Sequence, residues 1–261
     1  MIALNTTKTR IGDLSINEVV IGEGIPVLML HGWGVNIDLL WPLGSRLAPL
    51  GYRVWMLDLP GFGGSSEPHS PWMVTDYAQF VLNYLDHHQL DRVHLFGHSF
   101  GGRLGLILGA EHPERINKMV LANSAGIRAK TPLRTQVRLS TYKAVRDGLK
   151  RVGLGALSEK LRAAYNARYA STDFLTTSGV MRQTFVNVVN QDLRDYAARV
   201  KPSTLLLWGD QDMDTPLWQG QFLEKTIPDA GLVVFNGAGH YSYLDNLSET
   251  LRVMDYFFKG A

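Results

Sequence analysis

The chain has 261 residues, of which 45% are hydrophobic and 19% are charged, and its formal net charge is +2. This length and composition suit one large globular domain or two small ones. The absence of cysteine excludes disulfides, a thiolate nucleophile and a cysteine-ligated metal. A charge so close to zero gives no indication of nucleic-acid binding.

Residues 1–8 lack the long apolar stretch and the small-residue cleavage site of a signal peptide. No apolar run approaches the roughly 18 residues that a membrane-spanning helix needs. A chain without cysteine also fits a reducing compartment. We therefore expect a cytoplasmic protein with no membrane span and no nucleic-acid partner, and the oligomeric state stays unknown.

Short apolar runs alternate with helical patterns along most of the chain. Alternating strands and helices form a mostly parallel sheet with helices on both faces. The sequence therefore predicts an α/β fold with eight strands. The strands are expected at 7–11, 14–20, 26–30, 52–57, 93–96, 116–121, 204–208 and 232–235, and the helices at 38–50, 75–87, 102–110, 217–225 and 248–258.

The alternation stops near residue 125 and resumes near residue 201. Residues 126–200 are helical in pattern, so we interpret them as a helical cap inserted after the sixth strand of a core formed by 1–125 and 201–261. The cap holds 14 Lys and Arg against 5 Asp and Glu, whereas the core holds 12 against 19. This basic charge fits a solvated face attracted to an acidic core, or alternatively steering of anionic substrates or contact with an anionic surface.

The pattern G-x-S-x-G occurs once, as Gly97-His98-Ser99-Phe100-Gly101, between the strand at 93–96 and the helix at 102–110. A serine hydroxyl is a weak nucleophile and must stand clear of the sheet to meet a base and a substrate. Glycines at both ends let the strand and the helix approach closely. The pattern predicts that Ser99 is a nucleophile and that the Phe100 N–H faces a developing oxyanion.

A base and an orienting carboxylate follow later strands. His240 comes after the strand at 232–235, at the carboxyl edge of the sheet where α/β catalytic groups gather. The other histidines considered, at positions 87, 88, 98 and 112, are weaker candidates. Asp210, Asp212 and Asp214 all follow the strand at 204–208, and spacing alone does not choose among them.

An oxyanion hole needs a second donor besides Phe100. The loop His31-Gly32-Trp33-Gly34 follows the strand at 26–30, so its N–H groups can point toward the nucleophile. We nominate the N–H of Trp33, whose indole we expect to line the acyl pocket. The cap aromatics Tyr142, Tyr169 and Phe185 are further candidates for substrate binding, although at helical spacing such residues are more often simply part of the core.

Taken together, these motifs resemble the α/β-hydrolase fold superfamily along nearly the whole chain, in the subgroup of small capped carboxylesterases, biotin-pathway esterases and meta-cleavage-product hydrolases. The resemblance singles out Asp212 as the triad acid, with Ser99 and His240. The matching segments are 31–34, 58–63, 97–101, Gly209-x-x-Asp212-x-x-x-Pro216 and Gly237-x-Gly239-His240.

The resemblance implies a serine hydrolase acting on a small-molecule carboxylic ester with a small to medium acyl group, without metal or organic cofactor. Hydrolysis of a C–C bond is the alternative, but meta-cleavage hydrolases usually continue the first loop as Gly-Pro-Gly-Ala, where this chain has Gly34-Val35-Asn36-Ile37. A non-catalytic ligand receptor on the same fold is the alternative of another class, because a fold alone does not define a function.

Overall fold

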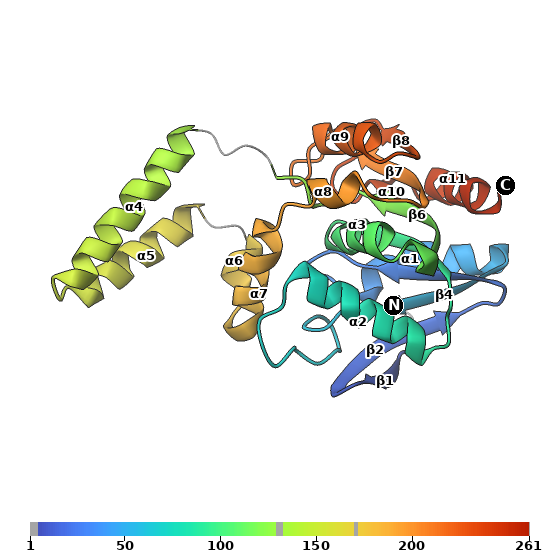
Figure 1. Cartoon of the computed structure of the whole chain (residues 1–261), viewed down its shortest axis with the longest axis horizontal. Helices are drawn as coiled ribbons and strands as arrows, with labels where there is room; N and C mark the ends of the chain where they lie inside the picture. Colours follow the sequence, from blue (N-terminus) through green and yellow to red (C-terminus); the bar gives the residue numbers. More distant parts are fainter. Residues whose placement is uncertain (1–4, 129–132, 170–171, 261) are drawn as a thin grey trace.

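The computed structural model describes residues 5–128, 133–169 and 172–260. Its centre is one eight-stranded sheet with the strand order β1-β2-β4-β3-β5-β6-β7-β8 (Figure 1). β2 pairs antiparallel with β1 and β4, and every other pair is parallel, which confirms the predicted fold class. The strands are β1 (Thr7–Ile11), β2 (Leu14–Ile21), β3 (Ile25–Leu30), β4 (Tyr52–Leu57), β5 (Val93–His98), β6 (Ile116–Ala122), β7 (Ser203–Gly209) and β8 (Ala230–Phe235).

An apolar layer covers each face of the sheet, because successive residues of a strand point to opposite sides. In β3, Leu28 and Leu30 belong to one layer, whereas Val27 and Met29 belong to the other. The first layer contains buried residues of α2, α3 and α9, and the second those of α1, α10 and α11. These helices are α1 (Ile37–Leu47), α2 (Val74–His87), α3 (Phe100–Glu111), α9 (Trp218–Thr226), α10 (Ser242–Asp245) and α11 (Leu247–Lys259), with short 3-10 turns η1 (Ala48–Leu50) and η2 (Pro113–Arg115).

The segment between β6 and β7 is helical, as predicted, but it has two parts of different character. Figure 1 shows α4 and α5 as a hairpin that extends away from the sheet, whereas α6 and α7 lie against the body. α4 buries none of its described residues, while α7 buries Met181, Phe185 and Val188. The helices are α4 (Leu133–Arg151), α5 (Gly155–Tyr169), α6 (Thr172–Thr176), α7 (Gly179–Asn190) and α8 (Arg194–Ala197).

Within the three described ranges, none of the helices combines the length and the apolar character needed to cross a membrane. The parallel strands β3, β5, β6, β7 and β8 all end at the same edge of the sheet. The loops that follow them therefore meet there, and they carry Trp33, Ser99, Asn123, Asp212 and His240.

Candidate active site

Ser99 occupies a strained turn between β5 and α3. Its φ of 50° with ψ of −103° lies in a region that residues other than glycine rarely adopt, so the surrounding packing must hold it. Its N–H donates to Ala122 O at 3.0 Å, and its carbonyl accepts from Ala125 N at 3.1 Å. These bonds fix the serine beside the end of β6.

The two glycines of the turn are required by close backbone contacts, as the sequence predicts. A Cβ atom on Gly97 would lie 2.6 Å from Gly101 O, and a Cβ atom on Gly101 would lie 2.2 Å from Leu30 O. Real Cβ atoms do not approach backbone oxygens so closely, so any side chain at either position would push the helix off the strand. The glycines therefore allow the close packing of β5 and α3 that positions Ser99 in the turn between them.

His240 is joined to Asp212 through its Nδ1 atom, which lies 2.8 Å from Asp212 Oδ2. The histidine side chain is 14% exposed and the carboxylate is fully covered. Burial alone would raise the pKa of Asp212, but hydrogen bonds from His240 and Thr215 outweigh it and lower that pKa to about 2. The carboxylate is therefore charged near neutral pH, and Nδ1 carries the hydrogen that points to it.

Asn123 and Thr215 complete the surroundings of Asp212, and neither was predicted from the sequence. Asn123 Nδ2 and Thr215 Oγ1 each lie 2.6 Å from Asp212 Oδ2, and the Thr215 N–H donates to Oδ1 at 2.9 Å. Asn123 Oδ1 in turn accepts from Ser242 Oγ at 2.5 Å. The signal that could have found Asn123 is its place directly after β6, at the same edge as the other site residues.

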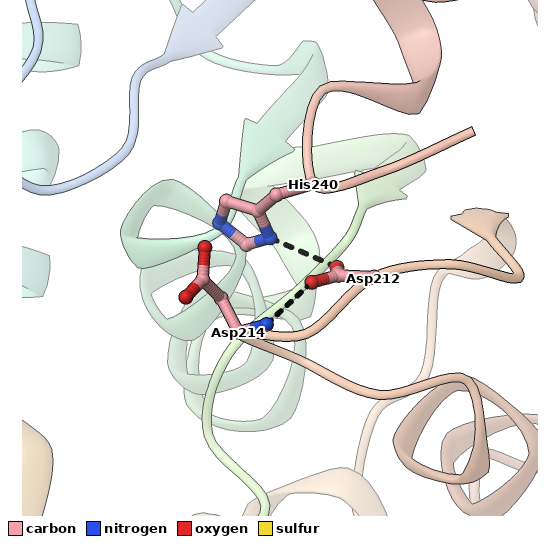
Figure 2. Close-up of side chains that lie close together, drawn as sticks. All are labelled: Asp212, Asp214 and His240. Carbon is pink, nitrogen blue, oxygen red and sulfur yellow. Dashed lines mark hydrogen bonds and ion pairs between the residues drawn. The ribbon is translucent and has the colours of Figure 1, made fainter.

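The structure separates the three aspartates that the sequence left open. Asp210 Oδ1 accepts from the Gly237 N–H at 2.7 Å and so joins the loop after β7 to the loop after β8. Asp214 is exposed, and Figure 2 shows its carboxylate beside the imidazole of His240 while its N–H donates to Asp212 Oδ1 at 2.8 Å. Only Asp212, of these three, bonds to His240 Nδ1.

Asp212, Asp214 and His240 also form a group of described residues whose ligand atoms lie within 4.8 Å of one another, as a metal site would require. Within this group, His240 Nδ1 is already hydrogen-bonded to Asp212 Oδ2. A metal ion bound to those two atoms would have to break that bond.

A cavity of about 580 Å³ contains both Ser99 and His240. Trp33 and Phe185 line it with their rings 5.2 Å apart, and Arg103 lines it as a buried cation that is 8% exposed. No hydrogen bond joins Ser99 Oγ to His240 Nε2 among the described residues. From the insertion, the cavity is lined by residues of α6 and α7, such as Asp173 and Phe185, and by none of the described residues of the hairpin.

Tyr142 and Tyr169 do not reach this cavity. Tyr142 of α4 stacks on Tyr165 of α5 with ring centroids 3.9 Å apart, and the Arg138 guanidinium lies 3.9 Å from the centre of the Tyr169 ring. These aromatics hold the hairpin together. The structure thus gives no support to their prediction as substrate-binding residues, because helical spacing marks a packed face without saying what it packs against.

The expected oxyanion donors belong to two loops that touch. The Gly101 N–H donates to His31 O at 3.1 Å, and a Cβ atom on Gly32 would lie 3.4 Å from Ser99 Cβ. Among the described turns and loops, no hydrogen bond uses the N–H of Trp33 or of Phe100. Both N–H groups thus lie near Ser99 without a backbone hydrogen-bond acceptor among the described loops.

The sequence matches the family described as alpha/beta hydrolase fold over residues 25–247. The chain therefore belongs to the α/β-hydrolase fold family. It is 28% identical to a 2-hydroxy-6-oxo-6-phenylhexa-2,4-dienoate hydrolase of Comamonas testosteroni, covering 98% of this chain and 97% of that protein. It is 25% identical to a pimeloyl-[acyl-carrier protein] methyl ester esterase of Chromobacterium violaceum, covering 90% of this chain and 94% of that protein.

A solved structure agrees with this family. The esterase EaEST from Exiguobacterium antarcticum has a TM-score of 0.74 at 24% identity, covering 97% of this chain and 99% of that one. This likeness shows the shared fold. The relatives include dienoate hydrolases and esterases, so family membership points to a hydrolase without choosing its substrate.

Proposed function

We propose that this protein is a serine hydrolase that cleaves carboxylic esters with small to medium acyl groups through an acyl-enzyme. The observation that carries the proposal is the 2.8 Å bond between His240 Nδ1 and Asp212 Oδ2 at a cavity that also contains Ser99. A receptor that only holds a ligand has no use for a charged carboxylate orienting a histidine beside a strained serine.

The roles follow from the hydrogen positions. Because Nδ1–H donates to Asp212, the Nε2 atom of His240 carries the lone pair and acts as the base. Ser99 attacks the ester carbonyl while Nε2 takes its proton, and the alcohol leaves with that proton. Water then repeats the sequence on the acyl-enzyme. Hydrogen bonds between nucleophile and base often tighten only in the substrate complex, so their absence in the free protein is compatible with this mechanism.

The N–H groups of Trp33 and Phe100 are the proposed donors to the oxyanion. Their position beside Ser99 and their freedom from other loop hydrogen bonds support this role. Losing one such donor typically costs about 3 kcal/mol of transition-state stabilisation. A backbone donor is not removed by substituting its side chain, so the assignment rests on geometry.

Hydrolysis of a C–C bond in a dienoate is the second candidate. Arg103 favours it, since a buried guanidinium lining the cavity suits a substrate carboxylate. Asp173 and Asp214 line the same cavity and oppose an anion. Burial and the neighbouring Asp214 raise the pKa of Asp173, so this corner disfavours negative charge and would disfavour a further anion. The loop 34–37 lacks the usual meta-cleavage sequence, and on balance we favour esters.

A panel of p-nitrophenyl esters of increasing acyl length, run beside a meta-cleavage dienoate, tests the choice. We expect turnover of acetyl to hexanoyl esters, with a burst of nitrophenol of roughly one per site if deacylation is slow. Ser99→Ala should remove it, and adding His240→Ala should cost little more because the two residues act as a unit.

Inert esters beside a rapidly cleaved dienoate would replace the ester assignment with C–C hydrolysis. If neither class reacts and a fluorophosphonate does not label Ser99, the receptor alternative replaces both. Lys259→Gln, at the far end of the chain, is the control for nonspecific loss because it lies outside the cavity.

A further inference from the structure

His98 lies between the loop of Gly32, Ser99 and the loop of His240, although it is not one of the proposed triad residues. It is the last residue of β5, directly before Ser99, and it is 1% exposed. Its Nε2 atom lies 3.0 Å from the carbonyl oxygen of His240. Its ring centroid lies 4.9 Å from that of His240, 5.1 Å from that of Tyr241 and 5.0 Å from that of Tyr243.

The protonation state of His98 follows from this contact. A carbonyl oxygen only accepts, so Nε2 must carry the hydrogen. Burial, followed by the proximity of His240, lowers the pKa of His98 to about 3, against smaller raising effects of the His240 carbonyl and of Asp212 and a further lowering by His31. The ring is therefore neutral during turnover, and His240 does not meet a second cation when it takes a proton.

The other nitrogen of His98 faces the oxyanion loop. Nδ1 is buried and has no hydrogen-bond partner among the described residues, and a Cβ atom on Gly32 would lie 3.0 Å from it. One edge of the ring thus packs against the loop of Gly32 and Trp33, and the other edge donates to the loop of His240. The ring is a spacer between the proposed oxyanion donor and the proposed base.

We propose that His98 is a positioning residue that fixes the His240 loop relative to Ser99. This inference rests on the proposed function. Because His98 and Ser99 are neighbours in the chain, the bond from Nε2 to His240 O joins the nucleophile's strand directly to the base's loop. Without it that partly buried carbonyl loses a donor, and His240 can shift relative to Ser99, which lowers the rate because catalysis depends on the spacing of the reacting groups.

Three substitutions separate this role from simple packing. Glutamine places an N–H at the same number of bonds from Cα as Nε2, asparagine places one at the distance of Nδ1, and leucine fills space with no donor. We expect His98→Gln to keep kcat within about 5-fold, and His98→Asn and His98→Leu to lower kcat about 10- to 100-fold. KM for a p-nitrophenyl ester should change less than about 3-fold in all three.

Fluorophosphonate labelling of Ser99 should slow in the same order, while thermal unfolding shows how much of each loss comes from stability. Equal losses in the glutamine and asparagine variants, or losses that simply follow the melting temperature, would overturn the proposal. So would a loss that appears in KM rather than in kcat.

The nitrogen NMR spectrum of the unmodified protein tests the inference independently of turnover. Between pH 5 and 8, His98 should remain in the neutral Nε2–H form, and a doubly protonated or Nδ1–H ring would overturn the proposal even if every variant failed to fold. If the protein hydrolyses no ester yet His98 shows this form and His98→Asn displaces the His240 resonances, the proposed function fails while the positioning contact stands.

Discussion

The two parts of the insertion between β6 and β7 differ in what they bury. α7 packs Met181, Phe185 and Val188 on the body, and Phe185 reaches the cavity of Ser99. In the hairpin of α4 and α5, Leu133 is 78% exposed and Val137 is 60% exposed. The part that forms the site is therefore the part with an apolar face that the body covers.

The two parts also differ in charge. Residues 133–169 hold nine Lys and Arg against two Asp and Glu, and thus most of the positive charge of the insertion. The ion pairs of the hairpin's described residues lie within the hairpin, such as the pair of Lys150 and Glu159 at 3.8 Å. Near His240, by contrast, the cavity carries the carboxylates of Asp173 and Asp214. A charge count over the whole insertion thus averages a strongly basic hairpin with a remainder that holds five Lys and Arg against three Asp and Glu.

The largest loss of activity is expected from a substitution at the candidate active site, at Asp212. Asp212→Asn should lower kcat on the order of 10⁴-fold, because an amide no longer holds His240 in the tautomer that leaves Nε2 free. Asp210→Asn and Asp214→Asn are the matched controls and should cost far less, since neither side chain bonds to Nδ1. Kinetics with one p-nitrophenyl ester measure all three, and a larger loss at Asp210 or Asp214 would reassign the acid.

A smaller effect should separate α7 from the hairpin directly. Phe185→Ala removes a ring that packs on Trp33 at the cavity wall, and we expect kcat/KM for medium-chain esters to fall about 10-fold. Tyr142→Ala removes an aromatic ring of the hairpin, and kcat/KM should stay within about 2-fold. Similar losses in the two variants, measured well below their melting temperatures, would mean that the hairpin closes over the site during turnover.

The smallest effect is expected from the charge of the hairpin. Replacing Arg134, Arg138, Arg146 and Arg151 by glutamine should lower kcat/KM a few-fold for anionic esters and leave neutral esters unchanged, with the difference erased at high salt. Steady-state kinetics at two ionic strengths provide the measurement. An equal effect on neutral esters would show that these side chains only keep the hairpin solvated.

Much of the fold followed from local patterns, and the reasons are visible at particular residues. The apolar runs 26–30 and 93–96 form central strands because both of their faces are covered. The turn at 97–101 was recognisable because its glycines meet a steric requirement that acts over only a few residues. The proximity of Ser99 and His240 was predictable because the loops after parallel strands meet at one edge of the sheet.

The choice among Asp210, Asp212 and Asp214 did not follow from spacing. All three lie in one loop, and only the folded loop decides which carboxylate reaches Nδ1. Asn123 was missed for a related reason. A buried asparagine after a strand has no pattern of its own, and its importance comes from Asp212, which lies 89 positions further along the chain.

The sequence by itself determined the sheet, the strained serine and the edge at which the site forms, because these depend on alternation of polarity and on backbone clashes between near neighbours. The tertiary structure alone decided which residues of the insertion line the cavity of Ser99, and which ring joins the loop of His240 to the strand before Ser99. Helical periodicity defines a face of a helix, but the partner of that face depends on the path of the whole chain. Tyr142 and Phe185 illustrate the difference, since both lie on predicted cap helices and only Phe185 is covered by the body.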